Sequence, residues 1–461
     1  MPVPVSSLLS PEDYARLLSH AANEQDFAYL GSVGAGDGRG SFSGFTACAI
    51  ATKRIDFGDA GALNTSKLAA EMETLVQRYE VPMQESQGFL TGGWIGFLSY
   101  EFGYMKEKRL SALCPVPATP LLFTGFYLWA ASHNRVTNTY HLWVHPKCPE
   151  QTRKNLQSWR STTPANKAAS WHMVSPFKAR QPVEEFMAGV EAVQCYINAG
   201  DCYQANLSQE FRGNYAGDPW LAFQALAEAN PTPYSAFIKA GAGAVLSISP
   251  ERFLEIRGRT VKTSPIKGTR PRGKTPSEDA AYAAELEASE KDRAENLMIV
   301  DLLRNDLSVH AAPGSVTVDS LFALESYRNV HHLVSHIRAE LAEDASPMQV
   351  LFDAFPGGSI TGAPKIRAME IIRELEPHWR GPYCGSVFYR GLDGTLDSNI
   401  AIRTMLCESE GAEDMAEEQG TIRCWGGGGI VADSDPESEY QETLTKVKPL
   451  MDFLENLNRN D

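Results

Sequence analysis

The interpretation of this chain begins at one stretch, Thr263-Ser264-Pro265-Ile266-Lys267-Gly268-Thr269-Arg270-Pro271-Arg272-Gly273. Pro265 fixes φ on the approach to Lys267, and Gly268 leaves room for backbone or substrate beside it. A lysine on such a rigid turn can lose water and be crowded by the arginines that follow it. Both effects favour the neutral amine, which can act as a nucleophile. The alternative interpretation of the same residues is a solvated basic loop.

The bulk properties are those of a large globular protein. A chain of 461 residues predicts two or three lobes, or one large α/β assembly. The composition, 43% hydrophobic and 21% charged, is typical of soluble domains. The formal net charge of −15 argues against a nucleic-acid surface. An anionic substrate would therefore need a local cationic site.

The first residues and the cysteines indicate the cellular compartment in which the protein is expected. Residues 1–7 lack a basic segment followed by an apolar one, so we expect no secretory signal. No apolar run approaches the length of a membrane span. The eight cysteines are scattered and form no CxxC pair, which disfavours a zinc site and a redox motif. We therefore expect a cytoplasmic protein with reduced thiols.

Two regions of the chain differ in pattern. Residues 1–160 carry short apolar and polar runs with frequent glycine, and Leu121–Trp129 is typical of a strand. Residues 149–169 are polar and predict a linker. Further along, longer helices alternate with strands. We therefore predict two domains, residues 1–160 and 174–458, in an α/β fold of the α+β type.

The second region has clear helix and strand signals. We predict helices over 182–198, 277–305 and 363–375 and one that begins near 434, and strands over 202–209, 244–249 and 421–425. In the last helix, Ser434 and Glu437 have the spacing of a capping box, and Pro436 suits the first turn.

Glu251 follows the strand predicted over 244–249. A carboxylate at a strand end can be partly desolvated, which raises its pKa and suits it to general acid catalysis. An ion pair with Arg252 or another surface cation is the alternative interpretation.

Two further glutamates lie in predicted helices. Glu295 has apolar neighbours at helical spacing, so its carboxylate requires a cation or a metal. An arginine such as Arg293 or Arg304 would meet the same requirement. Glu442 lies four residues before Lys446, and the two could form a solvated pair.

Two glycine-rich segments are candidate anion sites. Residues 357–365 open a predicted helix, whose free N–H groups favour a carboxylate. Gly426–Gly429 allows backbone amides to approach a ligand closely. Glycine clusters are also common in turns and in tight packing.

Three longer runs carry a resemblance to a known family: GGWIGFLSYE at 92–101, DRAENLMIVDL at 292–302 and FPGGSITGAPK at 355–365. With the stretch around Lys267, they are similar to the chorismate-utilising enzymes, and the similarity covers essentially the whole chain. Within this family the chain resembles component I of the aminodeoxychorismate synthases, because anthranilate synthases have alanine in the place of Lys267. The resemblance implies a two-lobed sandwich of large, mostly antiparallel sheets wrapped by helices. Its N-terminal lobe is of the anthranilate synthase component I type, and its second domain binds chorismate.

The resemblance also assigns roles to residues. It implies that Lys267 is the covalent nucleophile and Glu251 the general acid/base. Glu295 and Glu442 would hold one Mg²⁺ at the ring carboxylate of chorismate, and magnesium prefers such oxygen ligands. The implied substrate-binding residues are Thr361, Gly362, His332, Tyr389, Arg403, Gly427, Gly428, Gly429 and Lys446. His332 could equally be a hydrogen-bonded structural histidine.

Gln204 bears on the product. Isochorismate synthases of the family have a lysine at this place that activates water, whereas glutamine is no base near neutral pH. The resemblance therefore implies amination of chorismate to 4-amino-4-deoxychorismate, which leads to 4-aminobenzoate and folate. No cysteine lies in a Gly-x-Cys-x-Gly elbow, so we expect a separate glutamine amidotransferase subunit to supply ammonia. The alternatives are an anthranilate synthase large subunit and a non-catalytic tryptophan-binding regulatory subunit.

Relatives bind tryptophan in the N-terminal lobe. The matching positions in this chain are Leu30, Ser32, Phe42, Ser43 and Phe45. Gly44 stands where a relative has arginine. The alternative is that these side chains only pack the lobe.

Overall fold

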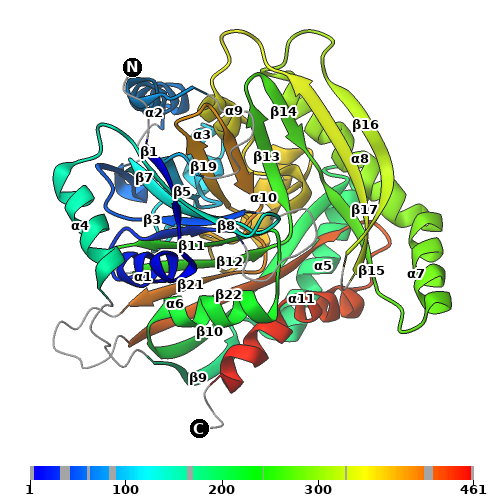
Figure 1. The fold of residues 1–461 in the computed structure, drawn as a ribbon. Coiled ribbons are helices and arrows are strands. Elements are labelled where there is room, and N and C mark those ends of the chain that lie inside the picture. The colour runs from blue at the N-terminus through cyan, green and yellow to red at the C-terminus, as the bar shows by residue number, and fades with distance from the viewer. Residues whose placement is uncertain are drawn as a thin grey trace.

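Two large sheets enclosed by helices make up the architecture (Figure 1). The structure, a computed structural model, describes residues 5–31, 42–59, 63–82, 90–162, 170–241, 243–327, 330–409 and 419–457. Every strand pairing in these ranges is antiparallel. The predicted α+β class with large, mostly antiparallel sheets is confirmed.

The first sheet has twelve strands. In spatial order they are β1 (Val5–Leu9), β8 (Thr139–Val144), β7 (Trp129–Asn134), β3 (Phe42–Thr46), β2 (Ala28–Leu30), β11 (Tyr234–Ala240), β12 (Gly243–Ser249), β21 (Thr404–Ser409), β22 (Gln419–Ile430), β10 (Gln204–Gly217) and β18 (Gly362–Ala363), and β9 (Trp171–Ala179) also pairs with β10. The ladder between β10 and β22 runs without interruption from Ala205–Ile430 to Ala216–Gln419. It fixes the glycine-rich part of β22 beside the start of β10.

The second sheet has ten strands. In spatial order they are β15 (Ile266–Pro271), β17 (Val330–Glu340), β14 (Thr260–Thr263), β13 (Arg252–Arg257), β20 (Leu396–Asn399), β19 (Ser386–Gly391), β5 (Gly93–Leu98), β6 (Leu122–Tyr127) and β4 (Ala51–Ile55), and β16 (Thr317–Ser326) pairs with β17. β15, β16 and β17 form one end of this sheet, on the right-hand side of Figure 1.

Helices cover both sheets. They are α1 (Pro11–Ala21), α2 (Thr65–Tyr79), α3 (Phe102–Lys106), α4 (Glu150–Ser161), α5 (Val183–Asn198), α6 (Pro219–Ala229), α7 (Pro276–Ala288), α8 (Glu290–Ser308), α9 (Pro347–Ala354), α10 (Lys365–Leu375) and α11 (Pro436–Asn456). Several begin with a Ser or Asp cap followed by proline, as Ser10-Pro11 does at α1. The cap side chain accepts a backbone N–H, and proline has no N–H to leave unpaired there.

Both sequence regions contribute strands to both sheets. β2 pairs with β11 in the first sheet, and β5 pairs with β19 in the second. Buried side chains of both sheets form one large cluster, in which Phe126, Trp129 and Trp425 are fully buried. The predicted boundary between residues 160 and 174 extends from the last turn of α4 into the first half of β9. The division into two domains there stays a prediction.

One predicted helix is divided in the structure. The sequence predicted a single helix over 277–305, but α7 ends at Ala288 and α8 begins at Glu290. Ser289 leaves the helical conformation, with φ −66° and ψ 105°, and its side chain accepts a hydrogen bond from the backbone N–H of Asp292. The prediction was wrong because serine satisfies the first turn of a new helix better than the middle of an old one.

The start of α11 also differs from the prediction. Its N-cap is Asp435, whose side chain accepts the backbone N–H of Ser438. Ser434 does not cap the helix, since its hydroxyl donates to the carboxylate of Glu439 at 2.7 Å. The predicted capping box was therefore wrong, whereas Pro436 does lie in the first turn.

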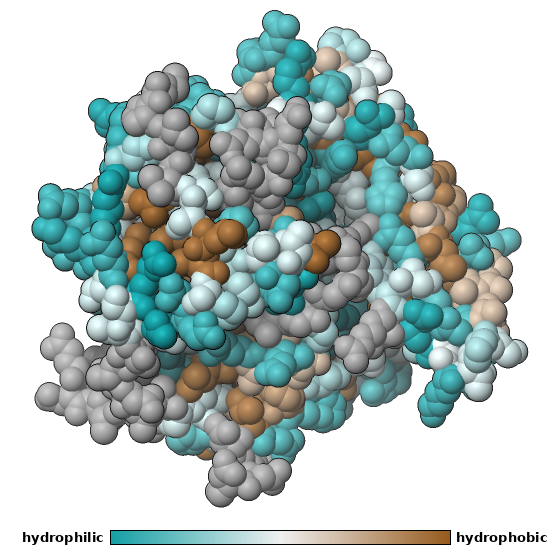
Figure 2. Space-filling model, viewed as in Figure 1, coloured by the Kyte–Doolittle hydropathy of each residue, from teal (hydrophilic) through white to brown (hydrophobic). Residues whose placement is uncertain are grey.

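The visible surface is mostly hydrophilic (Figure 2). Exposed apolar residues occur in small groups, and one follows the right-hand edge, where Val318 and Leu321 of β16 are 37% and 44% exposed. In the described ranges, no helix is both long enough and apolar enough to cross a membrane.

Candidate active site

Lys267 lies in β15 at a bulge beside β17. Its cross-strand neighbour is Leu333, and the register shifts at Gly268, which has φ +75°. A Cβ at Gly268 would lie 2.9 Å from the side chain of Asp292, so both the φ value and the close approach of α8 require glycine there. Lys267 thus projects from a strand and not from the turn that the sequence predicted. Its side chain is 14% exposed, and its Nζ lies 3.6 Å from Oε2 of Glu295.

The cation that balances Glu295 is therefore Lys267. The two arginines considered from the sequence have other contacts: Arg304 pairs with Asp301, and Arg293 lies over an aromatic ring of β16. The Glu295 side chain is 19% exposed, so it is partly shielded from water on α8. The ion pair joins α8 to β15.

Glu251 is a buried carboxyl group between β12 and β13. Burial raises its pKa to about 7, although the charge of Lys267 and a hydrogen bond from Ser359 both lower it. The Ser359 hydroxyl donates to Oε1 of Glu251 at 3.1 Å. Arg252 pairs with Asp397 instead, which removes the alternative considered above. The carboxyl group is poised to exchange a proton near neutral pH, and it feels the charge of Lys267.

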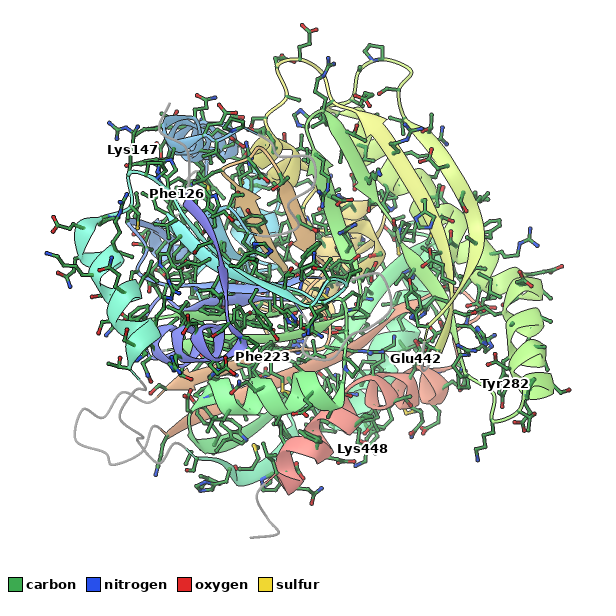
Figure 3. All side chains as sticks on the ribbon, in the orientation of Figure 1. Phe126, Lys147, Phe223, Tyr282, Glu442 and Lys448 are labelled. Atoms are coloured by element: carbon green, nitrogen blue, oxygen red, sulfur yellow. The ribbon has the colours of Figure 1, made fainter. Side chains whose placement is uncertain are left out.

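Glu442 lies on the second helix of the predicted metal site. Its Oε1 is 2.7 Å from Nζ of Lys446, one turn along α11. Burial raises the pKa of Glu442, but the charges of Lys446, Lys291 and Lys267 together outweigh it, so the pKa is lowered. Figure 3 shows Glu442 on the upper side of α11 and Lys448 on the lower side. The carboxylate is thus ionised and lies among cationic groups.

Glu295 and Glu442 are the proposed ligands of a divalent cation. Glu295 forms an ion pair with Lys267, and the charge of Lys267 also contributes to the lowered pKa of Glu442. Carboxylate oxygens are the ligands that Mg²⁺ prefers, and Mg²⁺ usually keeps several waters. Within the described ranges, no three or more His, Cys, Asp or Glu side chains form a metal-binding group by themselves. Glu295 and Glu442 would therefore bind Mg²⁺ together with water or substrate oxygens.

The glycines of β22 are required by packing on one face of the strand. A Cβ at Gly427 would lie 2.7 Å from the carbonyl oxygen of Leu207 and 2.8 Å from the hydroxyl of Tyr383. A Cβ at Gly429 would overlap Nε2 of Gln204. Side chains from β10 and from the segment before β19 therefore reach the β22 backbone itself.

The opposite face of β22 meets α11. A Cβ at Gly428 would lie 3.1 Å from Oε2 of Glu439 and 3.8 Å from both Glu442 and Lys446. Lys446 also donates to the carbonyl oxygen of Gly427 at 2.9 Å. The glycine-rich strand therefore lies beside Lys446 and the predicted metal ligand Glu442.

Thr361 and Gly362 are buried beside the first strand of the ladder. Gly362 has φ +134° and pairs with Ala205 in the short strand β18. The carbonyl oxygen of Thr361 accepts the backbone N–H of Asn206 at 2.9 Å. Its hydroxyl accepts a hydrogen bond from Tyr100 at 3.3 Å, so the N-terminal run at 92–101 supports this segment directly.

Arg403 is a cation with no counter-ion among the described residues. It adopts φ +50°, and burial lowers the pKa of its guanidinium group. In the part of the chain that the structure describes, its side chain has neither a hydrogen bond nor an ion pair. A desolvated guanidinium group strongly favours a carboxylate partner. Arg403 thus offers a local cation of the kind that the sequence analysis expected for an anionic substrate.

Tyr389 and Tyr383 differ from the sequence expectation. The hydroxyl of Tyr389 accepts the backbone N–H of Thr91 at 2.9 Å, so it is held by the N-terminal region. The tyrosine hydroxyl beside the glycine-rich strand is that of Tyr383, near Gly427. Sequence reasoning missed Tyr383, although its position in GPYCG, between two glycines, was an available signal.

His332 does not lie beside Lys267. Its cross-strand neighbour is Thr269, whose hydroxyl is 2.9 Å from Nδ1 of the imidazole. Side chains alternate along β17, so His332 faces the other side of the strand from Leu333, the neighbour of Lys267. This contact favours the interpretation of His332 as a hydrogen-bonded structural histidine, which the sequence left open.

A buried ion pair, which sequence reasoning missed, stabilises the segment before Thr361. Arg380 donates to both carboxylate oxygens of Glu376 and also to the carbonyl oxygens of Ile360 and Asn206. Both charged side chains are almost fully buried, 2% and 3% exposed. Arg380 therefore fixes the segment before Thr361 against β10.

The predicted tryptophan positions cluster on β2 and β3. Ser43 is buried and hydrogen-bonds to Tyr14 and Tyr29, and Phe45 packs edge-on against Tyr14 at 5.1 Å. Leu30 pairs with Gly44, and Phe42 is partly exposed. Ser32 lies outside the described residues. These contacts are what lobe packing requires, and tryptophan binding stays a prediction.

Comparison with known proteins assigns the family. The model of the chorismate binding enzyme family matches residues 29–452. The chain belongs to the chorismate binding enzymes. It is 44% identical to a protein of Klebsiella aerogenes named aminodeoxychorismate synthase component 1. The alignment extends over 367 residues, which are 79% of this chain and 78% of that protein.

Anthranilate synthases are also similar to this family member. Component 1 from Geobacillus stearothermophilus is 35% identical over 403 residues, 82% of this chain and 77% of that one. The crystal structure of anthranilate synthase component I from Streptococcus pneumoniae superposes with a TM-score of 0.75 at 28% identity, over 91% of this chain and 93% of that one. Fold and family are therefore shared by at least two different activities.

Proposed function

We propose that this chain is component I of an aminodeoxychorismate synthase, which converts chorismate and ammonia to 4-amino-4-deoxychorismate. The relatives of that name support the proposal. The observation that carries it is the position of Lys267, 3.6 Å from Glu295 and close enough to Glu251 to lower its pKa. An amine at this point lies between a proton donor and the predicted metal ligands.

In the first step, Lys267 passes to water the proton that it carries in the ion pair with Glu295, and its neutral amine then forms a bond to C2 of chorismate. The C1–C2 double bond moves to C1–C6, the C5–C6 double bond moves to C4–C5, and the C4–O bond breaks. Glu251 gives its proton to the departing hydroxyl, which leaves as water. The product is a covalent adduct with a charged secondary amine and an ionised Glu251.

In the second step, the lone pair of ammonia forms a bond to C4. The two double bonds return to their first positions, and the C2–N bond breaks with its electron pair returning to Lys267. The new ammonium group on C4 then gives one proton to Glu251, which restores the acid. The enolpyruvyl group stays attached throughout.

Substrate carboxylates are held by cations. Glu295 and Glu442 would bind Mg²⁺, which supplies positive charge for the ring carboxylate. Arg403 is a partner for the second carboxylate, because its guanidinium group has no counter-ion within the described part of the chain. Lys446 and the backbone of Gly427–Gly429 complete the same region.

Ammonia would come from a glutamine amidotransferase subunit, since relatives are named as one component of an enzyme. The product would serve 4-aminobenzoate and folate synthesis in the cytoplasm. The eight cysteines support a reducing location, because all of them are free thiols.

The test is product analysis with the isolated chain, chorismate, ammonium and Mg²⁺. We expect a product that yields 4-aminobenzoate only after aminodeoxychorismate lyase is added. Direct formation of fluorescent anthranilate would instead identify an anthranilate synthase. No turnover together with tight tryptophan binding would identify a regulatory subunit.

A further inference from the structure

A buried polar contact connects α8 to the strand beside Lys267. Ser335 of β17 and Asn296 of α8 are both fully buried. The hydroxyl of Ser335 donates to Oδ1 of Asn296 at 2.6 Å, and Nδ2 of Asn296 donates to the carbonyl oxygen of Leu333 at 3.4 Å. Leu333 is the cross-strand neighbour of Lys267, and Asn296 directly follows the glutamate that pairs with Lys267. The contact therefore lies beside both partners of that ion pair.

The side chains of Lys267, Leu333 and Ser335 point to one face of the second sheet. Residues two apart on a strand share a face, and so do directly opposite residues of neighbouring strands. α8 lies on that face, because it supplies both the partner of Lys267 and the partner of Ser335 (Figure 1). The ion pair and the buried hydrogen bond thus join the same helix to the same face of the sheet.

Apart from Asn296, the buried residues of α8 are apolar. They are Ile299, Val300, Leu303 and Leu307. Apolar packing is non-directional, so it holds a helix on a sheet without strictly fixing the position of the helix along its axis. Hydrogen bonds have preferred distances and angles, and a fully paired buried polar network rigidifies and specifies one arrangement. Asn296 is therefore the residue that fixes how far α8 is displaced along β17.

The strand on the other side of β17 has a bulge at the same place. The register between β16 and β17 shifts between Ser320 and Ala323, so two residues of β16 lie opposite Ser335. One of them, Phe322, has φ +57°, which is strained for a bulky side chain. Its backbone N–H donates to the hydroxyl of Ser335 at 3.1 Å, and the guanidinium group of Arg293 on α8 lies 4.9 Å from its ring. The bulge is thus held by the same hydroxyl and the same helix.

We propose that Ser335 and Asn296 are positioning residues, which keep the carboxylate of Glu295 at the amine of Lys267. This proposal rests on the amination of chorismate proposed above, in which Lys267 forms the bond to C2. Both positioning residues are fully buried, so they act through α8 and not on the substrate. Without their contact the helix keeps its apolar packing, but the carboxylate on its next residue is no longer held at one distance from the amine.

The test compares Ser335→Ala and Asn296→Leu with the wild type. Adduct formation on Lys267 is measured by intact mass after rapid quenching, with chorismate and Mg²⁺ and without ammonia. We expect the rate of adduct formation to fall at least about tenfold in each variant, because a displacement of about 1 Å can cost about 100-fold. The affinity for chorismate, measured by calorimetric titration, should change less than about threefold.

A double variant separates position from stability. Each single variant leaves one partner of the hydrogen bond buried and unpaired, so both should unfold at a lower temperature than the wild type. The double variant S335A/N296L removes both partners, so its melting temperature should lie above that of the less stable single variant. Its rate of adduct formation should nevertheless stay at least about tenfold below that of the wild type. A merely structural role would restore the rate together with the stability.

Ser132→Ala is the matched control. Ser132 is a buried serine of β7 in the first sheet, and its hydroxyl accepts the backbone N–H of Leu90 at 3.0 Å. Loss of this hydroxyl should lower the melting temperature and leave the rate of adduct formation unchanged.

A wild-type rate in both single variants would overturn the inference. So would a rate that recovers in the double variant, equal slowing in Ser132→Ala, or a loss of chorismate affinity as large as the loss of rate. Failure of the proposed function is a different result, because the wild-type protein itself would then form no adduct.

Discussion

Lys267 and Glu295 face each other across the contact between β15 and α8, with 3.6 Å between Nζ and Oε2. The pair couples the proposed nucleophile to a proposed metal ligand, because any cation bound by Glu295 competes with the ammonium group of Lys267. The same ammonium group lowers the pKa of Glu251 and of Glu442. Lys267, the proposed nucleophile, is therefore coupled to the proposed acid and to both proposed metal ligands.

Replacing Lys267 by alanine should remove the adduct. We expect the rate of amination to fall by about three orders of magnitude, since alanine has no amine to bond to C2. Chorismate should still bind, because its carboxylates contact other groups. Intact-mass spectrometry after quenching gives the adduct, and calorimetry gives the affinity. Lys262→Ala, an exposed lysine on β14, is the control. Full activity in Lys267→Ala would refute covalent catalysis.

Glu251 should give the activity a pH limit near neutrality. Its carboxyl group has to be protonated to donate to the leaving hydroxyl, and burial raises its pKa to about 7. We therefore expect kcat to fall as the pH rises above about 7. Glu251→Gln should lower kcat by about 10²- to 10⁴-fold and should remove this fall of kcat above pH 7. A pH–rate profile of the variant that still bends near 7 would exclude Glu251 as the acid.

The same group should affect stability. Because its pKa is higher in the folded than in the unfolded protein, the stabilisation is complete below about pH 4.5 and is lost as the pH rises through about 7. At 1.36 kcal/mol per pH unit, the loss is on the order of 3 kcal/mol. Denaturant unfolding of wild type and Glu251→Gln at pH 5 and pH 8 measures it. The free energy of unfolding of Glu251→Gln, relative to that of the wild type, should be higher at pH 8 than at pH 5. The same relative value at both pH values would contradict a buried acid at Glu251.

Parts of this site were predictable from local sequence. Glu251 was expected at the end of a strand over 244–249, and β12 covers Gly243–Ser249. The glycines of residues 426–429 were expected to allow close approach, and side chains do reach the backbone of β22 on both faces. Such features depend on a few neighbouring residues, which a single sequence displays.

Long-range features were not predictable. The pairing of Glu295 with Lys267 depends on how α8 packs on β15, and no helical spacing contains that information. Ser289 divides a helix whose residues on both sides are good helix formers, so only the capping bond reveals the break. Arg380 was missed because two of its partners, the carbonyl oxygens of Ile360 and Asn206, meet it only in the folded protein, although Glu376 lies only four residues before it.

Metal binding should require both helices. Glu295→Gln and Glu442→Gln each remove one charged oxygen ligand, so we expect the affinity for Mn²⁺, a spectroscopic substitute for Mg²⁺, to fall at least about tenfold in each. Electron paramagnetic resonance titration measures free Mn²⁺ directly and needs no activity. Glu437→Gln, in the first turn of α11, is the control. Unchanged Mn²⁺ binding in both variants would exclude a shared site.

The buried pair of Arg380 and Glu376 should be a major source of stability. Arg380→Met leaves the Glu376 carboxylate buried without its cation, which typically costs 3–5 kcal/mol. Two backbone carbonyls, of Ile360 and Asn206, also lose their donor. Urea unfolding with an unchanged m-value would report the loss. Arg373→Met, a more exposed arginine of α10, should cost far less.

The two adjacent glycines of β22 should respond differently to alanine. At Gly427 the new Cβ would lie 2.7 Å from a backbone carbonyl oxygen, which has little freedom to move. At Gly428 the nearest atom, 3.1 Å away, is the end of the flexible Glu439 side chain. We therefore expect Gly427→Ala to shift β10 and weaken chorismate binding at least about tenfold, whereas Gly428→Ala should keep the wild-type melting temperature within a few degrees. Calorimetric titration and thermal unfolding of both proteins measure the difference. If both variants bound chorismate equally well, the close contact of β22 with Leu207 and Tyr383 would not be a requirement of the site.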